Sequence, residues 1–346
     1  MTVPERLLAL VDAFADRRVL VIGDIIADEF IYGQIARVSR EAPVLILDYD
    51  STEIVPGGAG NAASNVAALG GRATTIGVVG RDESGRRLLA TMKGRRIDVR
   101  RMVVPSGGRT PTKTRILAGG IHSAKQQVVR IDRAANGAAD QRTRALFEDR
   151  VLTAAPGADA LLVSDYGTGL VTPALVVRAR DRMRTAIDDR AGKRGRGSPI
   201  VLVDSRYDLL RFKGMTACTP NESEVEQALG VRIGDNVRTL ERAGRSVLAR
   251  TRSRAVLITR GSRGMAIFRP GEKTIHIPIV GSDQIADVTG AGDTVIATMT
   301  LALAAGGTFE EAAHLANHAG GIVVMKRGTA TVTAAELRAS LAQRAE

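Results

Sequence analysis

Short apolar runs alternate with longer, helix-like segments along most of this chain. Five runs have the length and composition of buried strands, at residues 19–24, 74–80, 160–166, 199–205 and 255–261. Helix candidates lie between them, for example at residues 61–70, 142–154 and 222–230. Repeated alternation of strand and helix predicts a mainly parallel sheet covered on both faces, which is a three-layer α/β/α fold.

Four of the apolar runs close on polar residues, Asp24, Asp165, Asp204 and Thr259. In open α/β sheets, ligands bind beyond the carboxyl ends of the strands, at the edge where these side chains would gather. The sequence therefore predicts a ligand site built from this edge of the sheet.

Two regions interrupt the alternation, at about residues 30–55 and 110–133. The first has the alternating pattern of extended chain, and the second resembles a hairpin that turns near residues 118–123. Together they predict a small antiparallel sheet that projects from the main domain as a lid. Neither an internal repeat nor a low-complexity linker divides the chain, so residues 1–346 are expected to form one domain.

The charge of the chain is strongly positive, since 49 Lys and Arg outnumber 37 Asp and Glu for a formal net charge of +12. This excess attracts anions, either a small phosphorylated substrate or a nucleic-acid backbone. Part of it lies at residues 178–199, where a solvated helix face and loop is the simpler interpretation. With only 3% aromatic residues and no nucleic-acid-reading motif, the expectation is that no nucleic acid is bound.

The cysteine count and hydropathy exclude other classes. Cys218 is the single cysteine, so no intrachain disulfide forms and no multi-cysteine metal site is available. The four histidines have no metal-ligand spacing. A signal-like N-terminus and an apolar run of about 18 residues are both lacking, which gives the expectation of a cytoplasmic protein without membrane contact.

The segment DVTGAGDT, residues 287–294, precedes a long apolar run. Its glycines permit a sharp turn and close approach of a phosphate, and the N-H groups at the start of the next helix favour an anion. Asp293 would sit at this helix start, where a carboxylate can accept a proton from an attacking hydroxyl. An ordinary glycine turn with Asp293 as a helix cap is the structural alternative.

A second glycine pattern competes with this interpretation. Gly58, Gly60 and Ala63 satisfy the G-x-G-x-x-A spacing of a dinucleotide-binding turn, and Asp82 follows about 20 residues later. The buried strand that should precede such a turn is replaced by Pro56 and polar residues. An NAD-linked dehydrogenase thus remains only as a weak alternative, and a P-loop is absent.

Taken in order, these segments resemble the ribokinase-like, or PfkB, family of sugar kinases. DVTGAGD and GGAGNAASN (57–65) match its two glycine-rich signatures. Three further motifs of the family occur in the same order along the chain: GDIIAD (23–28), NESE (221–224) and TRGSRG (259–264). Within the family, the likeness is strongest to kinases that phosphorylate D-glycero-β-D-manno-heptose 7-phosphate at O1 in ADP-heptose biosynthesis. The segments that carry it are 36–44, 112–115, 126–132, 163–166 and 317–332.

The resemblance implies a role for each matching residue. Asp293 would be the catalytic base, with the backbone of Gly290, Ala291 and Gly292 as the anion hole. The sugar would contact Asp24, Asp28, Gly57, Gly58, Asn61 and Asp165. The candidates for the phosphate that the substrate already carries are the lid residues Arg37, Lys113, Arg115, Gln127 and Arg130. The ATP-binding site would be lined by Thr259, Gly261, Gly264, Thr289 and Asn317. Asn221 and Glu224 would bind Mg²⁺ through water.

The resemblance also implies a homodimer formed through the lid, and it adds K⁺ as a candidate activator. No nucleotidyltransferase domain is expected within residues 1–346, although bifunctional relatives carry one. Two segments depart from the heptokinase pattern: Gly167, Thr168 and Gly169 stand where it has x-Lys-Gly, and Ser205 and Arg206 stand where it has Pro-Lys. A kinase for a different sugar, or a sensing protein without turnover, are the alternatives.

Overall fold

The computed structural model describes residues 2–119, 125–134, 139–191, 197–281 and 287–343. Two predicted features fall partly outside these residues. Most of the turn expected near residues 118–123 is one of them, and the end of the basic segment at 178–199 is the other. Within the described part of that segment, Arg178 pairs with Glu148 and Arg180 with Asp181 at the protein surface.

The main sheet has eight strands in the order β12-β11-β10-β9-β8-β7-β1-β4. The six strands from β10 to β4 are parallel, and β11 and β12 extend the sheet by antiparallel pairing. Their bounds are β1 Arg18–Gly23, β4 Arg72–Ile76, β7 Ala160–Asp165, β8 Ile200–Ser205, β9 Ala217–Cys218, β10 Ala255–Thr259, β11 Met265–Phe268 and β12 Ile275–Ile277.

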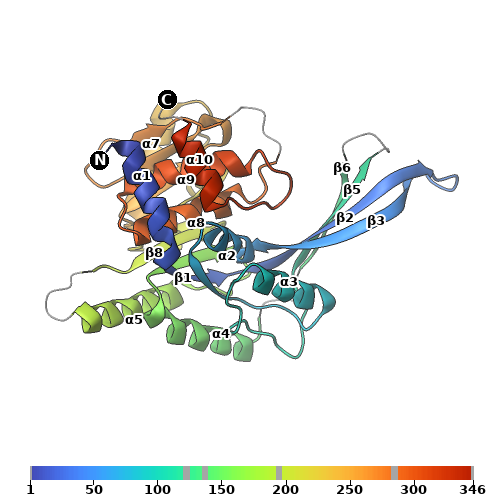
Figure 1. The fold of residues 1–346 in the computed structure, drawn as a ribbon, viewed down its shortest axis with the longest axis horizontal. Coiled ribbons are helices and arrows are strands. Elements are labelled where there is room, and N and C mark those ends of the chain that lie inside the picture. Colours follow the sequence, from blue (N-terminus) through green and yellow to red (C-terminus); the bar gives the residue numbers. More distant parts are fainter. Residues whose placement is uncertain (1, 120–124, 135–138, 192–196, 282–286, 344–346) are drawn as a thin grey trace.

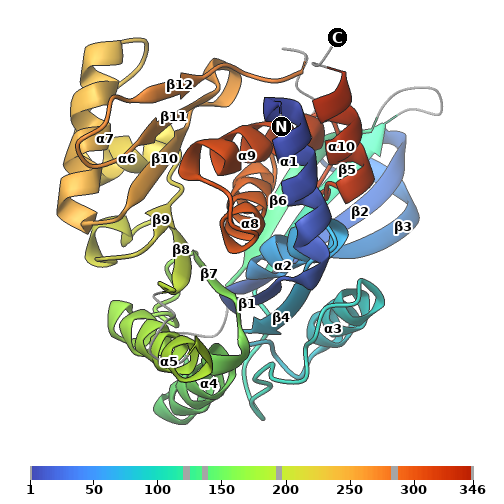
Figure 2. The ribbon, with the colours of Figure 1, turned by 60° about the vertical axis from the view of Figure 1, so that its left-hand side comes forward.

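Helices cover both faces of this sheet because its strands are apolar on both sides. Along β1, Val19 and Val21 enter one hydrophobic core, whereas Leu20 and Ile22 enter another. Figure 2 shows α4, α5, α6 and α7 on one side and α1, α2, α8, α9 and α10 on the other. The predicted three-layer α/β/α fold is therefore confirmed. The helices are α1 Val3–Asp12, α2 Ala59–Ala68, α3 Glu83–Gly94, α4 Gln141–Ala154, α5 Pro173–Ala191, α6 Glu222–Leu229, α7 Val237–Thr251, α8 Ala291–Ala304, α9 Phe309–Val323 and α10 Ala334–Ala342.

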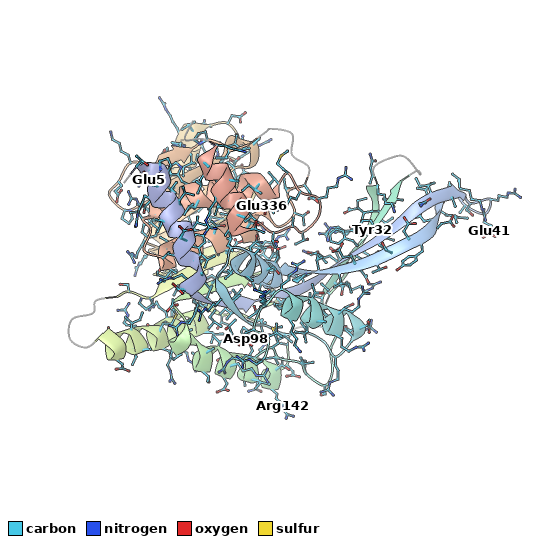
Figure 3. All side chains as sticks on the ribbon, in the orientation of Figure 1. Glu5, Tyr32, Glu41, Asp98, Arg142 and Glu336 are labelled. Atoms are coloured by element: carbon cyan, nitrogen blue, oxygen red, sulfur yellow. The ribbon has the colours of Figure 1, made fainter. Side chains whose placement is uncertain are left out.

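A separate four-stranded sheet projects from this body as the lid (Figure 1). Figure 3 shows Tyr32 part of the way along it and Glu41 at its far tip. Its strand order is β3-β2-β5-β6, and its pairing differs from the prediction because β2 and β5 are parallel. Between β2 and β5 the chain passes through β3, α2, β4 and α3, and it re-enters the lid in the same direction as β2. The strands are β2 Ile25–Val38, β3 Leu45–Gly58, β5 Thr112–Gly119 and β6 Gln126–Arg133.

The apolar segment after DVTGAGDT forms α8, which lies in the protein core. Its residues from Asp293 to Leu303 are all buried, and α9 and α2 pack against it. An all-round apolar helix is stable only in such an interior position. Among the described residues, no helix is both long enough and apolar enough to cross a membrane.

Candidate functional site

Three cavities follow the carboxyl edge of the main sheet in the order of its strands. The β10 cavity, of about 430 Å³, lies beside Thr259 at the end of β10. The central cavity, of about 510 Å³, lies beyond β8 and β7, where Asp204 and Asp165 line it. The β4 cavity, of about 320 Å³, is bounded by Asp24 after β1 and Val78 after β4. The predicted position of the ligand site, at this edge of the sheet, agrees with all three.

Asp293 lines the central cavity at the start of α8, and only 3% of it is exposed. Its Oδ2 accepts a hydrogen bond from Nδ2 of Asn61 at 2.9 Å, and its Oδ1 lies 3.4 Å from the hydroxyl of Tyr166. Burial raises the pKa of Asp293 to about 7, and the nearby charge of Asp28 adds to this effect. A carboxyl group with this pKa can gain and lose a proton near neutral pH, as a general base must.

The backbone around Gly290 explains why DVTGAGDT needs a glycine here. Gly290 has a φ of 80° and caps α8, and a Cβ at this position would lie 2.4 Å from Nδ2 of Asn61. A side chain would therefore displace the amide that holds Asp293. Gly290 and Gly292 line the central cavity, whereas the N-H of Ala291 donates to the carbonyl oxygen of Val288 at 3.2 Å.

Asp24 lines the β4 cavity and is hydrogen-bonded to Tyr166, which lines the central cavity. Its carboxylate accepts hydrogen bonds from the backbone N-H of Tyr166, at 2.7 Å, and from the backbone and hydroxyl of Thr168. Burial raises the pKa of Asp24, although these hydrogen bonds oppose the shift. Because Tyr166 also approaches Asp293, a short chain of contacts joins the two carboxyl groups across the edge of the sheet.

Asp28 and Asp165 are both buried but already have partners. Asp28 pairs with Nη1 of Arg115 at 2.6 Å and accepts from the hydroxyl of Thr329 at 3.1 Å. Gly57 is required beside it, because a Cβ there would lie 2.3 Å from Oδ2 of Asp28. Asp165 accepts from the hydroxyl of Ser205 at 2.7 Å and from the N-H of Gly167 at 3.0 Å.

Acidic groups crowd the central cavity. Asn221 and Glu224 form a capping box at the start of α6, in which each side chain accepts from the other's backbone N-H at 2.9 Å. Burial, followed by repulsion from Glu224, raises the pKa of Asp204 well above its usual range. The pKa of Glu224 is also raised by burial. Of the positions that depart from the heptokinase pattern, Arg206 lines this cavity.

This acidity fits a divalent cation that is held through water. Within the described ranges, no three His, Cys, Asp or Glu side chains are arranged to hold a metal ion directly. Mg²⁺ keeps several water ligands and commonly uses one or two carboxylates together with substrate phosphates. Asp204 and Glu224 supply carboxylates of this kind beside the start of α8.

The β10 cavity is more apolar than the central one. Met265, Ile279, Val295 and Val324 line it together with four residues of the predicted nucleotide set, Thr259, Gly261, Gly264 and Asn317. Asn317 is buried and donates to the carbonyl oxygen of Pro278 at 2.7 Å. Thr289, the fifth residue of that set, lines the central cavity instead.

The five basic or polar lid residues divide into two groups. Lys113 lies over the ring of Tyr166, with 5.3 Å from Nζ to the ring centroid, and Arg115 pairs with Asp28, so both are at the site. The remaining three are exposed, line none of the three cavities and stay predictions as phosphate ligands: Arg37, Gln127 and Arg130, the last paired with Asp132 at 2.9 Å.

Some site residues were not predicted as ligands. Tyr166 lines the central cavity and Thr168 the β4 cavity, and both closely follow the end of β7. Asp204 was predicted only as a polar strand end at this edge, without a role of its own. Arg109 lines the β4 cavity. No sequence signal distinguished it from the other arginines.

The dinucleotide-binding alternative does not fit the structure. Gly58 and Gly60 follow β3, a lid strand that pairs antiparallel with β2, rather than a parallel strand of the main sheet. Asp82 does not lie at a ribose position but caps α3 and binds Thr110. The strand-turn-helix unit that this fingerprint requires is therefore not formed by these residues.

The sequence is similar to carbohydrate kinases along most of its length. A family model described as pfkB family carbohydrate kinase matches residues 16–336. The bifunctional protein HldE of Caulobacter vibrioides is 40% identical over 329 residues, which cover 94% of this chain and 64% of that protein. HldE of Geobacter sulfurreducens is 39% identical over 322 residues, covering 93% of this chain and 62% of the relative. The chain thus spans less than two thirds of the length of these relatives.

Solved structures share the fold at much lower identity. Phosphofructokinase-2 from Escherichia coli, in complex with substrates and products, has a TM-score of 0.73 at 19% identity, with 95% of this chain and 99% of that chain covered. Ribokinase from Arabidopsis thaliana, complexed with ribose and ATP, has a TM-score of 0.66 at 17% identity, with 94% and 98% covered. At these identities the similarity is one of fold.

Proposed function

Because the chain belongs to the pfkB family of carbohydrate kinases, we propose that it transfers the γ-phosphoryl group of ATP to O1 of D-glycero-β-D-manno-heptose 7-phosphate. The product would be the 1,7-bisphosphate used in ADP-heptose biosynthesis. The observation that carries the proposal is the buried carboxyl group of Asp293, with a pKa of about 7, at the start of α8. It stands where the central cavity approaches Asp24.

The order of the cavities supports an assignment of the two substrates. The apolar β10 cavity suits the adenine and ribose of ATP, since ligand pockets are mainly apolar with a few polar groups. The adjoining central cavity would take the phosphates, facing the first turn of α8 at Gly292, since the N-H of Ala291 is already bonded to Val288. The sugar would lie on the other side of Asp293, near Asp24, Asn61 and the lid.

The chemistry follows from this arrangement. Asp293 takes the proton from the O1 hydroxyl while that oxygen forms a bond to the γ-phosphorus. The bond between the γ-phosphorus and the β–γ bridging oxygen breaks, so that ADP leaves with this electron pair. The N-H groups near Gly292 and the dipole of α8 stabilise the negative charge of the transferring group. The lid would exclude water from the site.

Asp204 and Glu224 would hold Mg²⁺ through water, with Asn221 fixing the position of Glu224. A bound Mg²⁺ would neutralise charge on the β- and γ-phosphates. Burial raises the pKa of both carboxyl groups, and repulsion from Glu224 adds to the shift of Asp204, so a nearby cation would favour their ionised forms. We also propose that K⁺ activates the enzyme. A solved structure of Escherichia coli phosphofructokinase-2, which shares the fold, is in complex with potassium.

The choice of heptose 7-phosphate relies on similarity to the HldE proteins, which are 39–40% identical to this chain in the two cases above. ADP release with Mg-ATP should be compared for the heptose 7-phosphate, fructose 6-phosphate, ribose, fructose and adenosine, with and without K⁺. At least tenfold preference for the heptose phosphate supports the proposal. Preference for another sugar would assign the chain a different acceptor, and no turnover would favour the sensing alternative.

We also propose that the lid joins two copies of the chain. Paired residues share a face of a sheet, and the register places several exposed apolar side chains on the lid face opposite Asp28 and Phe30. Monomeric proteins rarely expose large apolar patches. These residues are Ile35, Val38, Leu45, Tyr49, Val129 and Ile131. Sedimentation should give a dimer that Val38→Asp dissociates, and a wild-type monomer at micromolar concentration would contradict the proposal.

With ATP as the phosphoryl donor, we place the reaction in the cytoplasm.

A further inference from the structure

We infer that the β4 cavity binds the phosphate that the acceptor sugar already carries, and that Arg109 is the residue that selects for it. This inference rests on the proposed function, because it concerns the acceptor of that reaction. The cavity, of about 320 Å³, is lined by Asp24 and lies at the β1–β4 end of the sheet edge, the β10 cavity lies beside β10, and Asp293 lines the central cavity between them. A seven-carbon sugar whose O1 faces Asp293 would direct its other end toward this cavity.

Arg109 is positioned to bind an anion there. It lines the cavity, it is exposed, and its guanidinium has no ion pair or hydrogen bond to any residue that the structure describes. Most other arginines near the site have protein partners, as Arg115 has in Asp28 and Arg260 in Glu222. An unpaired guanidinium can form two parallel hydrogen bonds to a phosphate.

The loop that carries Arg109 is held in place. Asp82 accepts hydrogen bonds from the N-H and the hydroxyl of Thr110, at 2.9 and 2.6 Å, and that hydroxyl also accepts from the N-H of Gly80 at 3.0 Å. Burial would raise the pKa of Asp82, but these hydrogen bonds outweigh it and lower the pKa. The carbonyl oxygen of Pro111 then accepts from the N-H of Ala27, at 2.8 Å, which ties the loop to β2.

Gly80 shows how closely this loop is packed. A Cβ at residue 80 would lie 2.7–2.8 Å from backbone atoms of Arg109 and Thr110. The backbone of Arg109 therefore packs against Gly80 and is followed directly by the hydrogen-bonded Thr110, which reduces the entropy cost of placing the Arg109 side chain. This is the kind of support that a binding residue needs from its surroundings.

The other charged groups of the cavity do not compete for the guanidinium. Asp140 caps α4, where its carboxylate accepts from the N-H of Thr143 at 2.6 Å. Asp24 is occupied by Tyr166 and Thr168. Ser106, Gly107 and Gly108 complete this wall with small residues that leave room for a phosphate.

The test compares Arg109→Ala with Arg142→Ala, a matched loss of one exposed arginine near the start of α4. Arg142 does not line the cavity, and Figure 3 shows it at the margin of the molecule. The assay measures kcat/KM for heptose 7-phosphate and for the same heptose without its phosphate. We expect Arg109→Ala to reduce the preference for the phosphorylated sugar by about 10- to 100-fold, mainly through KM, as charge-assisted hydrogen bonds are lost.

The unphosphorylated heptose controls for a structural effect, since a damaged fold would slow both sugars equally. Arg109→Lys should restore part of the preference, because a point charge replaces the fork. A change in preference no larger than that of Arg142→Ala would overturn the inference.

Binding measurements separate this inference from the proposed function. Calorimetric titration of heptose 7-phosphate into Asp293→Asn needs no turnover, and the same titration into Asp293→Asn with Arg109→Ala should show at least tenfold weaker binding. If wild type prefers another acceptor in the substrate panel, the proposed function fails, and the same titrations with that sugar phosphate decide the inference. Equal binding with and without Arg109, or binding of no sugar phosphate, would refute it.

Discussion

The two halves of the site differ in how their charges are balanced. On the side of β8 and β9, carboxylates face each other, and the pKa values of Asp204 and Glu224 are raised. On the side of β1 and the lid, Asp28 is neutralised by Arg115, and Lys113 lies close by over Tyr166. One half thus has an excess of negative charge, whereas the other supplies its own cations.

This difference in charge matches the charges of the two proposed substrates. ATP binds as a complex with a divalent cation, so carboxylates of the protein can bind the cation of that complex. A sugar phosphate arrives as a bare anion, so its half of the site must provide the positive charge, for which Arg109 and Lys113 are available. Asp293 lies between the two halves of the site. Variants of Asp293 and the pH dependence of its carboxyl group therefore test the proposed division first.

Replacing Asp293 should have the largest effect. Asp293→Asn keeps the hydrogen bond from Asn61 but cannot accept the proton of O1, so kcat should fall by at least about 100-fold. Titrations of each substrate should show binding within a fewfold of wild type. Turnover at the wild-type rate with both substrates bound would exclude Asp293 as the base.

The pH dependence should be large on the acidic side. Because the base must be deprotonated and the pKa of Asp293 is about 7, kcat/KM should fall about tenfold per pH unit below 7 and level off above it. The profile should be recorded at saturating Mg²⁺. A plateau that extends to pH 5 would show that another group sets the rate.

Removing a carboxylate on the nucleotide side should have a smaller and one-sided effect. Glu224→Gln should raise the KM for Mg-ATP about tenfold, because charge that favours the cation is lost, while the KM for the sugar stays unchanged. Glu310→Gln removes a glutamate from the first turn of α9, another helix, and serves as the control. An equal effect on both KM values would contradict the separation of the halves.

The smallest expected effect is on the free energy of unfolding of the Asp293→Asn variant. The pKa of Asp293 is raised from 3.8 to about 7, so the folded state binds the proton more tightly than the unfolded state. Its ionisation therefore destabilises the fold as pH rises from about 4 to 7, and the penalty is complete above 7. Asp293→Asn should gain about 1–4 kcal/mol relative to wild type at pH 8, compared with little at pH 4. Urea unfolding at both pH values measures this difference, and an equal gain at both would argue against it.

The sequence by itself determined the elements and the local chemistry. The strand ends at Asp24, Asp165 and Thr259, the glycine turn at Gly290 and the start of α8 are all consequences of a few neighbouring residues. Backbone preferences and hydrophobic periodicity act over such short distances. For this reason, the three-layer fold and the place of Asp293 could be predicted without the structure.

Only the tertiary structure decided which distant residues meet. Asn61 reaches Asp293 across 232 positions, and Asp82 holds Thr110 across 28. The parallel entry of β5 beside β2, and the separation of Arg130 from the cavities, also depend on how the lid packs and not on local pattern. Contacts between residues so far apart in the sequence depend on how whole helices and strands pack and on which side chains become buried. A single sequence therefore left Arg109 as one arginine among many.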